Sequence, residues 1–309
     1  MARGAVGPRL AVTVGDPRGI GPELIAKAVA AAVLPRERLV LVGPRGAGLD
    51  VDVAVGDWSV DDTVADAGRL AGRAVDAAVD LALAGDVAGI VTAPLDKAAL
   101  HAGGYDVPGH TELLARRTGR DTAMMLAATG PRPGERGTLR VVLATTHVAL
   151  RDVPALLTAD RLARTAAITR AGLTDGFGVV EPRIALCALN PHAGDGGRFG
   201  TEDDALLRPL ARDLGLAGPF PADTVFVRAL RGEFDAVIAP YHDVGMTAIK
   251  VAAFGRAVNV TLGLPFPRTS PDHGTALDIA GRGIADPSSF FEALRLCDAL
   301  AHHTAPAPV

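Results

Sequence analysis

Residues 10–30 read LAVTVGDPRGIGPELIAKAVA, and this stretch contains the pattern that decides the fold. A short apolar run is followed by a turn rich in glycine and proline and then by apolar residues at helical spacing. The same order recurs along the chain. Predicted strands are Leu10–Val14, Leu39–Val42, Gly89–Val91, Leu139–Ala144, Arg183–Leu189, Asp235–Ala239 and Val258–Leu262. Predicted helices include Pro22–Ala32, Thr63–Ala84, Ala159–Ala171 and Asp204–Leu214. Alternating strands and helices predict an α/β protein.

Composition excludes several classes of function. The 309 residues suit two domains or one large α/β domain. The net charge is −4 and no basic block is present, which argues against a nucleic-acid partner. Acidic residues or prolines interrupt every apolar stretch before it reaches the roughly 18 residues of a membrane span. The first residues lack the features of a signal peptide, so we expect a cytoplasmic enzyme, with Cys187 and Cys297 as buried thiols.

Three histidines directly follow predicted strands. They are His147, His192 and His242. In α/β sheets ligands gather beyond the carboxyl ends of strands, and neutral imidazoles presented there are suited to a divalent cation such as zinc. Their spacing matches no local zinc motif, so two interpretations stay open: a metal site, or hydrogen-bonding residues at a sheet edge or an interface. Asp195, in the glycine-rich turn after His192, is a candidate to orient an imidazole or to cap the turn.

Lysine is scarce in this chain, and its positions are informative. The lysines are Lys27, Lys97 and Lys250, and arginine supplies the other basic side chains. Lys97 and Lys250 are candidates for a compact or deprotonatable ammonium, whereas Lys27 is predicted on the solvated face of a helix. Lys250, Asn259 and Arg268 recur at nine-residue intervals and are suited to clamping a phosphate or carboxylate, with ordinary surface pairs as the alternative.

Two glycine-bearing loops complete the candidate features. The loop at 15–23 has neither the Walker pattern nor the dinucleotide fingerprint, and its Pro22 and Glu23 are typical of a helix start. The stretch 272–281 has too few bulky side chains for a core and is predicted to be a loop over which a flat group lies. Residues 43–61 are predicted to be an irregular connection.

Several motifs, taken in order, resemble the 4-hydroxythreonine-4-phosphate dehydrogenases of vitamin B6 biosynthesis, and the resemblance covers nearly the whole chain. The matching stretches are Val14-Gly-Asp-Pro-Arg-Gly-Ile-Gly-Pro-Glu23, Gly109-His-Thr-Glu112, Ala144-Thr-Thr-His-Val-Ala-Leu-Arg-Asp-Val153, Leu189-Asn-Pro-His-Ala-Gly-Asp-Gly-Gly197, Tyr241-His-Asp243, Val258-Asn-Val-Thr-Leu-Gly-Leu-Pro-Phe-Pro-Arg-Thr-Ser270 and the His-Gly-Thr-Ala loop from 273.

The resemblance implies a set of site residues and partners. The ligands of one divalent cation (Zn, Mg, Mn or Co) would be His147, His192 and His242. The contacts to a small phosphorylated substrate would be His110, Thr111, Lys250, Asn259 and Arg268. The contacts to NAD, or NADP, would be His273, Gly274 and Asp278. The family further implies a homodimer whose two active sites are shared between the subunits.

The family's relation to isocitrate and isopropylmalate dehydrogenases implies the fold. We expect two α/β/α domains, not a Rossmann fold. The first would comprise residues 1–108 and 256–309 and carry the NAD loop. The second would comprise residues 109–255 and carry the metal histidines and the dimer interface.

The implied reaction is oxidation of 4-phosphooxy-L-threonine at C3 and decarboxylation to 3-amino-2-oxopropyl phosphate. His242 and Lys250 would be catalytic, with Lys250 relaying a proton from a different element than the strand ends. Family members usually carry Asn or His where this chain has Asp96, and often Gln where it has Val244. These departures leave open a D-threonate or D-erythronate 4-phosphate dehydrogenase or a cis-dihydrodiol dehydrogenase. Rivals outside the family are a three-histidine metallohydrolase and a non-catalytic sensor.

Overall fold

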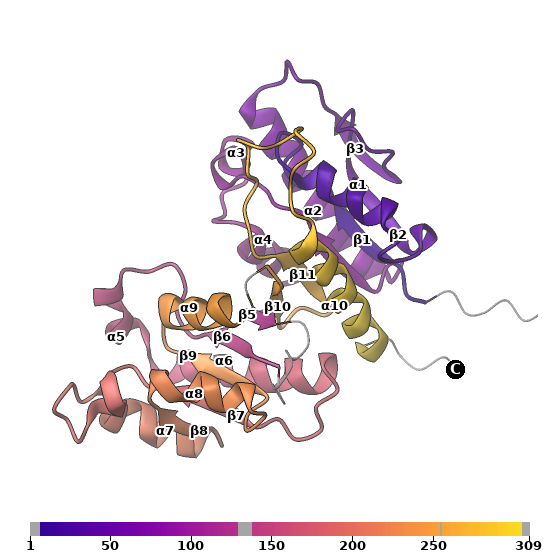
Figure 1. Cartoon of the computed structure of the whole chain (residues 1–309). Helices are drawn as coiled ribbons and strands as arrows, with labels where there is room; N and C mark the ends of the chain where they lie inside the picture. Colours follow the sequence, from indigo (N-terminus) through magenta and orange to yellow (C-terminus); the bar gives the residue numbers. More distant parts are fainter. Residues whose placement is uncertain (1–6, 129–137, 254, 305–309) are drawn as a thin grey trace, which may run out of the picture. The chain divides into compact units, whose positions relative to one another are not determined.

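The computed structural model describes residues 7–128, 138–253 and 255–304. The chain divides into two compact units (Figure 1). Unit 1 comprises Met1–Arg120 and Leu264–Val309, and unit 2 comprises Asp121–Gly263. Compared with the expected boundaries, residues 109–120 therefore lie in unit 1 and residues 256–263 in unit 2. The physical reason is packing: Leu113 and Leu114 belong to the core of unit 1, whereas the strand at 257–262 pairs with a strand of unit 2.

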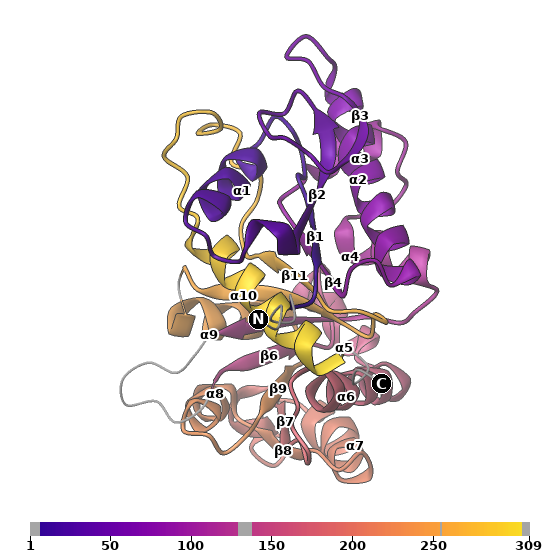
Figure 2. The ribbon, with the colours of Figure 1, turned by 90° about the vertical axis from the view of Figure 1, so that its right-hand side faces the viewer.

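Unit 1 is a parallel five-stranded sheet with helices on both faces. Its strands, in spatial order, are β3 (Val53–Asp57), β2 (Leu39–Arg45), β1 (Leu10–Thr13), β4 (Gly89–Thr92) and β11 (Arg268–Pro271). Its helices are α1 (Gly21–Ala30), α2 (Val64–Ala84), α3 (Lys97–Ala102), α4 (His110–Thr118) and α10 (Ser288–Thr304). Figure 2 shows α1 and α10 on one face of this sheet and α2, α3 and α4 on the other.

Local sequence explains where the two predicted helices of this unit begin and end. Helix α1 has proline in its first turn and buries Leu24, Ile25 and Ala28, one apolar face at helical spacing. Helix α2 starts at a capping box of Thr63 and Asp66 and ends at Gly85 in the left-handed region.

The expectation of an irregular connection at 43–61 was wrong, because β3 lies within it. This five-residue edge strand is only half-buried and contains a glycine, so its apolar pattern is weak.

Unit 2 is a mixed six-stranded sheet. Its strands, in spatial order, are β10 (Ala257–Leu262), β5 (Ala123–Ala128), β6 (Arg140–Leu143), β9 (Ala236–Ala239), β7 (Ile184–Cys187) and β8 (Ala217–Phe220). The pairs β10–β5 and β5–β6 are antiparallel, and the rest are parallel. Its helices are α5 (Val153–Leu156), α6 (Ala159–Ala171), α7 (Arg208–Asp213), α8 (Ala222–Leu230) and α9 (His242–Ala253). Figure 2 shows α8 and α9 on one face and α6 and α7 on the other.

The two cysteines are buried free thiols, as expected. Burial raises the pKa of Cys187 and of Cys297 to about 12, so neither is a ready thiolate nucleophile. No helix within the described residues is long and apolar enough to cross a membrane.

Candidate active site

The three candidate metal histidines follow three adjacent parallel strands of unit 2. His147 follows β6, His242 begins α9 directly after β9, and His192 follows β7. The pairings β6–β9 and β9–β7 are both parallel, so the carboxyl ends of these strands meet at one edge of the sheet. We call this edge the histidine rim.

Two of these histidines lie close together. The ring centroids of His147 and His242 are 5.4 Å apart, with 46° between the ring planes. The Nδ1 atom of His242 lies 2.7 Å from a carboxylate oxygen of Asp243, a contact that helps to fix the orientation of the ring. The ring of His192 lies against Phe199, 6.3 Å between centroids. Among the described residues, no three or more His, Cys, Asp or Glu side chains are grouped closely enough to hold a metal ion.

A buried carboxylate holds the turn that presents His192. Asp203 is fully buried and accepts hydrogen bonds from the backbone amides of Leu189 (2.8 Å) and Asn190 (2.9 Å). Within the turn, His192 itself adopts the left-handed region at φ 53°, which is uncommon outside glycine. Our sequence reasoning pointed to Asp195 and missed Asp203. Asp195 is exposed and pairs with Arg198 at 3.4 Å.

Lys250 and Asn259 also lie in unit 2. Lys250 is on the same helix as His242, not on a separate element as expected, and eight residues along α9 separate the two by about 12 Å. The prediction failed because α9 continues without a break from its first residue to the lysine. Asn259 lies in the middle of β10, and its buried Oδ1 atom has no hydrogen-bond partner among the described residues.

Unit 1 contains a buried basic group. Arg268 begins β11, is 2% exposed, and donates from Nη2 to the hydroxyl of Thr92 at 2.6 Å. His110 is the first residue of α4, followed by Thr111, and its buried Nε2 atom has no hydrogen-bond partner among the described residues. An ideal Cβ at Gly109 would lie 3.5 Å from Cε of Lys97, which places the lysine beside the start of α4.

The electrostatics of this group favour an anion. Burial lowers the pKa of Arg268 to about 10, so the guanidinium stays charged at neutral pH. Burial, together with the charges of Arg268 and Lys97, lowers the pKa of His110 well below its usual range. A neutral imidazole therefore lies beside two cations, Arg268 and Lys97, at the amino end of a helix, with the carboxylate of Glu112 also nearby. Two positive charges against one negative charge leave an excess suited to phosphate or carboxylate.

The candidate dinucleotide loop also lies in unit 1. His273, Gly274 and Asp278 are exposed, and no atom would touch a Cβ built at Gly274. The backbone at Gly274 is therefore open to close approach by a flat ligand. The carbonyl of Thr275 accepts a hydrogen bond from the amide of Ile20 at 3.0 Å, which joins this loop to the one that starts α1.

The sequence profile described as "Pyridoxal phosphate biosynthetic protein PdxA" matches residues 25–297. This chain belongs to the PdxA family. It is 42% identical to a 4-hydroxythreonine-4-phosphate dehydrogenase of Chromobacterium violaceum, over 96% of this chain and 98% of that one. It is also 42% identical to a Bradyrhizobium diazoefficiens protein provisionally named D-threonate 4-phosphate dehydrogenase, over 94% and 96%. The predicted family is thus confirmed.

Solved structures agree with this PdxA assignment. The structure of 4-hydroxythreonine-4-phosphate dehydrogenase from Klebsiella pneumoniae superposes with a TM-score of 0.82 at 37% identity, covering 96% of this chain and all of that one. A β-decarboxylating dehydrogenase from Thermococcus kodakarensis matches with a TM-score of 0.51 at 18% identity, covering 95% and 83%, which shows the fold alone. The expected relation of the PdxA fold to that class is consistent with this match.

The loop at 15–19 of this PdxA chain contains an ion pair that sequence reasoning missed. Asp16 is fully buried, and Arg18 binds both of its carboxylate oxygens, from Nε at 3.0 Å and from Nη2 at 2.6 Å. The hydrogen bond to Asp16 raises the pKa of Arg18. Asp96 lies 4.0 Å from the same guanidinium and caps α3 by accepting from the Ala99 amide. The sequence feature that could have revealed this ion pair is Asp-Pro-Arg between two glycines.

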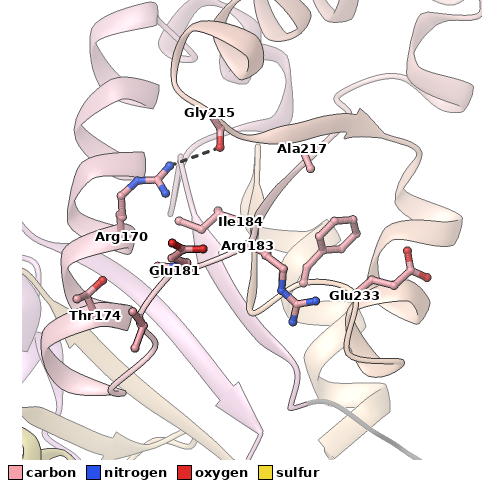
Figure 3. A pocket seen from close by; sticks show the side chains of 11 residues that line it. Arg170, Thr174, Glu181, Arg183, Ile184, Gly215, Ala217 and Glu233 are labelled. Atoms are coloured by element: carbon pink, nitrogen blue, oxygen red, sulfur yellow. Dashed lines mark hydrogen bonds between the residues drawn. The ribbon is translucent and has the colours of Figure 1, made fainter.

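A separate hollow of about 590 Å³ opens at the other end of β7, away from the histidine rim (Figure 3). Arg170 and Arg183 line it together with Glu181 and Glu233. Arg170 donates to the carbonyl of Leu214 at 3.1 Å, and Arg183 is paired with Asp235. Because both guanidinium groups are already engaged and the lining charges balance, we assign no ligand to this hollow of the PdxA fold.

Proposed function

We propose that this chain is a 4-hydroxythreonine-4-phosphate dehydrogenase, active with NAD and a divalent cation. The proposed substrate is 4-phosphooxy-L-threonine. Hydride leaves C3 for NAD as the C3 hydroxyl loses its proton, and the resulting β-keto acid loses CO₂ and regains a proton at C2. The products are NADH, CO₂ and 3-amino-2-oxopropyl phosphate. The observation that carries the proposal is the buried basic group at α4, in a chain whose full-length relatives have this name.

The phosphate is assigned to the basic group of unit 1. Arg268 offers a planar guanidinium already oriented by Thr92, and the amides of His110 and Thr111 belong to the first turn of α4. A neutral His110 accepts or donates through Nε2 without adding charge. Lys250 and Asn259 of unit 2 are proposed as further polar contacts, and the unpartnered Oδ1 of Asn259 is an acceptor for a substrate hydroxyl or ammonium.

The metal is assigned to His147, His192 and His242. The 5.4 Å between the rings of His147 and His242 and the Asp243 contact of His242 support these two as a pair of ligands, because oriented neutral imidazoles bind zinc and related cations well. His192 is assigned as the third ligand from its place after the adjacent parallel strand, β7. These histidines would hold a divalent cation, which would supply Lewis acidity for loss of the hydroxyl proton and for the decarboxylation. Lys250 is proposed to carry the hydroxyl proton on Nζ.

We infer a homodimer with shared sites from one feature of unit 2. Beside the histidines, large apolar side chains are exposed: Val148 is 42%, Leu150 65% and Phe199 49% exposed. Such residues are typical of a subunit interface.

The dinucleotide is assigned to His273, Gly274 and Asp278. The open backbone at Gly274 and the exposed carboxylate of Asp278 fit an adenosine lying on the loop. NAD supplies the hydride acceptor when bound.

The test follows NADH absorbance with chelator-treated protein. The substrates are 4-phosphooxy-L-threonine, D-threonate 4-phosphate and D-erythronate 4-phosphate, each with and without zinc, manganese or magnesium. We expect metal-dependent NADH formation with the amino substrate. Preference for a sugar-acid phosphate would favour the second candidate, which the Bradyrhizobium relative's name and the charged Asp96 beside Lys97 support. Turnover of a phosphate ester without NAD would contradict both and favour a hydrolase.

A further inference from the structure

Two side chains of helix α1 form hydrogen bonds with the backbone of the segment that follows the candidate dinucleotide loop. The carboxylate of Glu23 accepts from the amides of Ala285 (2.8 Å) and Gly283 (3.2 Å). The ammonium of Lys27 donates to the carbonyls of the same two residues, at 2.6 Å and 3.0 Å, and to Glu23 at 2.7 Å. We call these two side chains with the backbone of 283–285 the α1 clasp.

The same stretch of chain holds the loop at a second point. The Ile20 amide donates to the Thr275 carbonyl at 3.0 Å, and a Cβ at Gly19 would come within 2.9 Å of that oxygen. Residues 276–282, including Asp278, thus lie between two points at which the chain is hydrogen-bonded to residues 19–27. Helix α1 is itself fixed by its buried apolar face, so it transmits its position to the loop.

The chemistry of the clasp explains why a lysine stands there. Lys27 was expected on a solvated helix face, and that expectation was wrong: its side chain is 31% exposed and its ammonium has three acceptors. Three donors on one nitrogen match three converging oxygens, whereas a planar guanidinium of similar reach does not. The hydrogen bond from Lys27 also lowers the pKa of Glu23, which keeps the carboxylate ionised and able to accept both amides.

We propose that Glu23 and Lys27 are positioning residues that set the affinity for the dinucleotide by holding the 273–281 loop in its binding conformation. This inference rests on the proposed function, in which that loop binds NAD. Neither side chain belongs to the groups assigned to the phosphate or to the metal. Loss of the clasp therefore weakens dinucleotide binding and leaves the KM for the phosphorylated substrate and the kcat at saturating NAD nearly unchanged.

The experiment compares Lys27→Met, Glu23→Gln and the double variant in the full chain. The dissociation constant of NADH is measured by fluorescence, together with KM for NAD, KM for substrate and kcat. We expect each single variant to weaken NADH binding on the order of tenfold, as for loss of a charged hydrogen bond, and the double variant to be no worse than the poorer single variant. Lys27→Arg, which keeps the charge, should fold normally and still weaken NADH binding.

The matched control is Arg69→Met, which removes an exposed ion pair with Asp66 on α2 of the same unit and should leave NADH binding unchanged. Unaltered NADH affinity in folded Lys27→Met and Lys27→Arg would overturn the clasp while leaving the proposed function intact. An equal loss in kcat and in substrate KM would overturn it as well, because it would show a general structural defect. A wild-type protein that binds no NADH would overturn both proposals together.

Discussion

At the scale of single residues, burial decides how His110 ionises. The folded unit 1 favours the neutral imidazole, because burial and the charges of Arg268 and Lys97 lower its pKa. As the pH falls, His110 therefore takes up a proton more readily in the unfolded chain than in the folded one. The free energy of unfolding should decrease below about pH 6.5, by up to about 1.4 kcal/mol per pH unit. We expect His110→Gln to remove this slope in urea unfolding between pH 5 and 7.5. His101→Gln, at an exposed histidine of α3, should retain it; identical slopes in wild type and His110→Gln would contradict the assignment.

The planar shape of the buried Arg268 guanidinium leads to a second prediction. The side chain is held by Thr92 and is 2% exposed, so a lysine in its place keeps the charge but loses the two-pronged geometry. We expect Arg268→Lys to raise the KM for the phosphorylated substrate about tenfold or more while KM for NAD changes little. Arg295→Lys, on the exposed face of α10, serves as the control. An unchanged substrate KM would remove Arg268 from the phosphate site.

At the scale of elements, the turn between β7 and the stretch at 203–207 determines where His192 lies. Asp203 holds two amides of that turn from a fully buried position. We expect Asp203→Asn to destabilise unit 2 by about 1–3 kcal/mol and to weaken zinc binding about 10–100-fold in competition with a chromophoric chelator. The control is Asp204→Asn, which removes only a surface pair with Arg208. Full zinc affinity in folded Asp203→Asn would show that the turn does not orient a ligand.

At the scale of the whole molecule, the exposed apolar residues beside the histidines are expected to pair two copies. Leu150→Glu would place a charge in that interface, and sedimentation velocity should then show a monomer in place of the dimer. Val180→Glu alters an even more exposed apolar residue near the other end of β7 and should leave the dimer intact. A wild-type protein that sediments as a monomer at micromolar concentration would refute the shared-site arrangement.

Every strand that the apolar runs predicted is present, because burial on both faces of a sheet leaves a mostly apolar run of residues. Sequence reasoning missed two of the other strands for different reasons. β5 is a continuous apolar run, but its alanine and methionine residues are common in helices, whereas β11 reads Arg-Thr-Ser-Pro and has no apolar run. They extend because their neighbours supply the hydrogen-bond partners, β6 and β10 for β5 and β4 for β11. Such tertiary partners are not visible in a local window.

The sequence by itself determined the α/β class, the family and the residue types of the site, because periodicity, glycine placement and strand-end histidines are local features. The tertiary structure alone decided which of these groups share an environment. It brought His110 and Arg268, far apart in the chain, into one buried group, placed Lys250 a helix-length from His242, and turned Lys27 from a solvated residue into a clasp. The physical reason is that burial, charge and hydrogen-bond partners depend on contacts between distant segments, which the pattern of one segment does not contain.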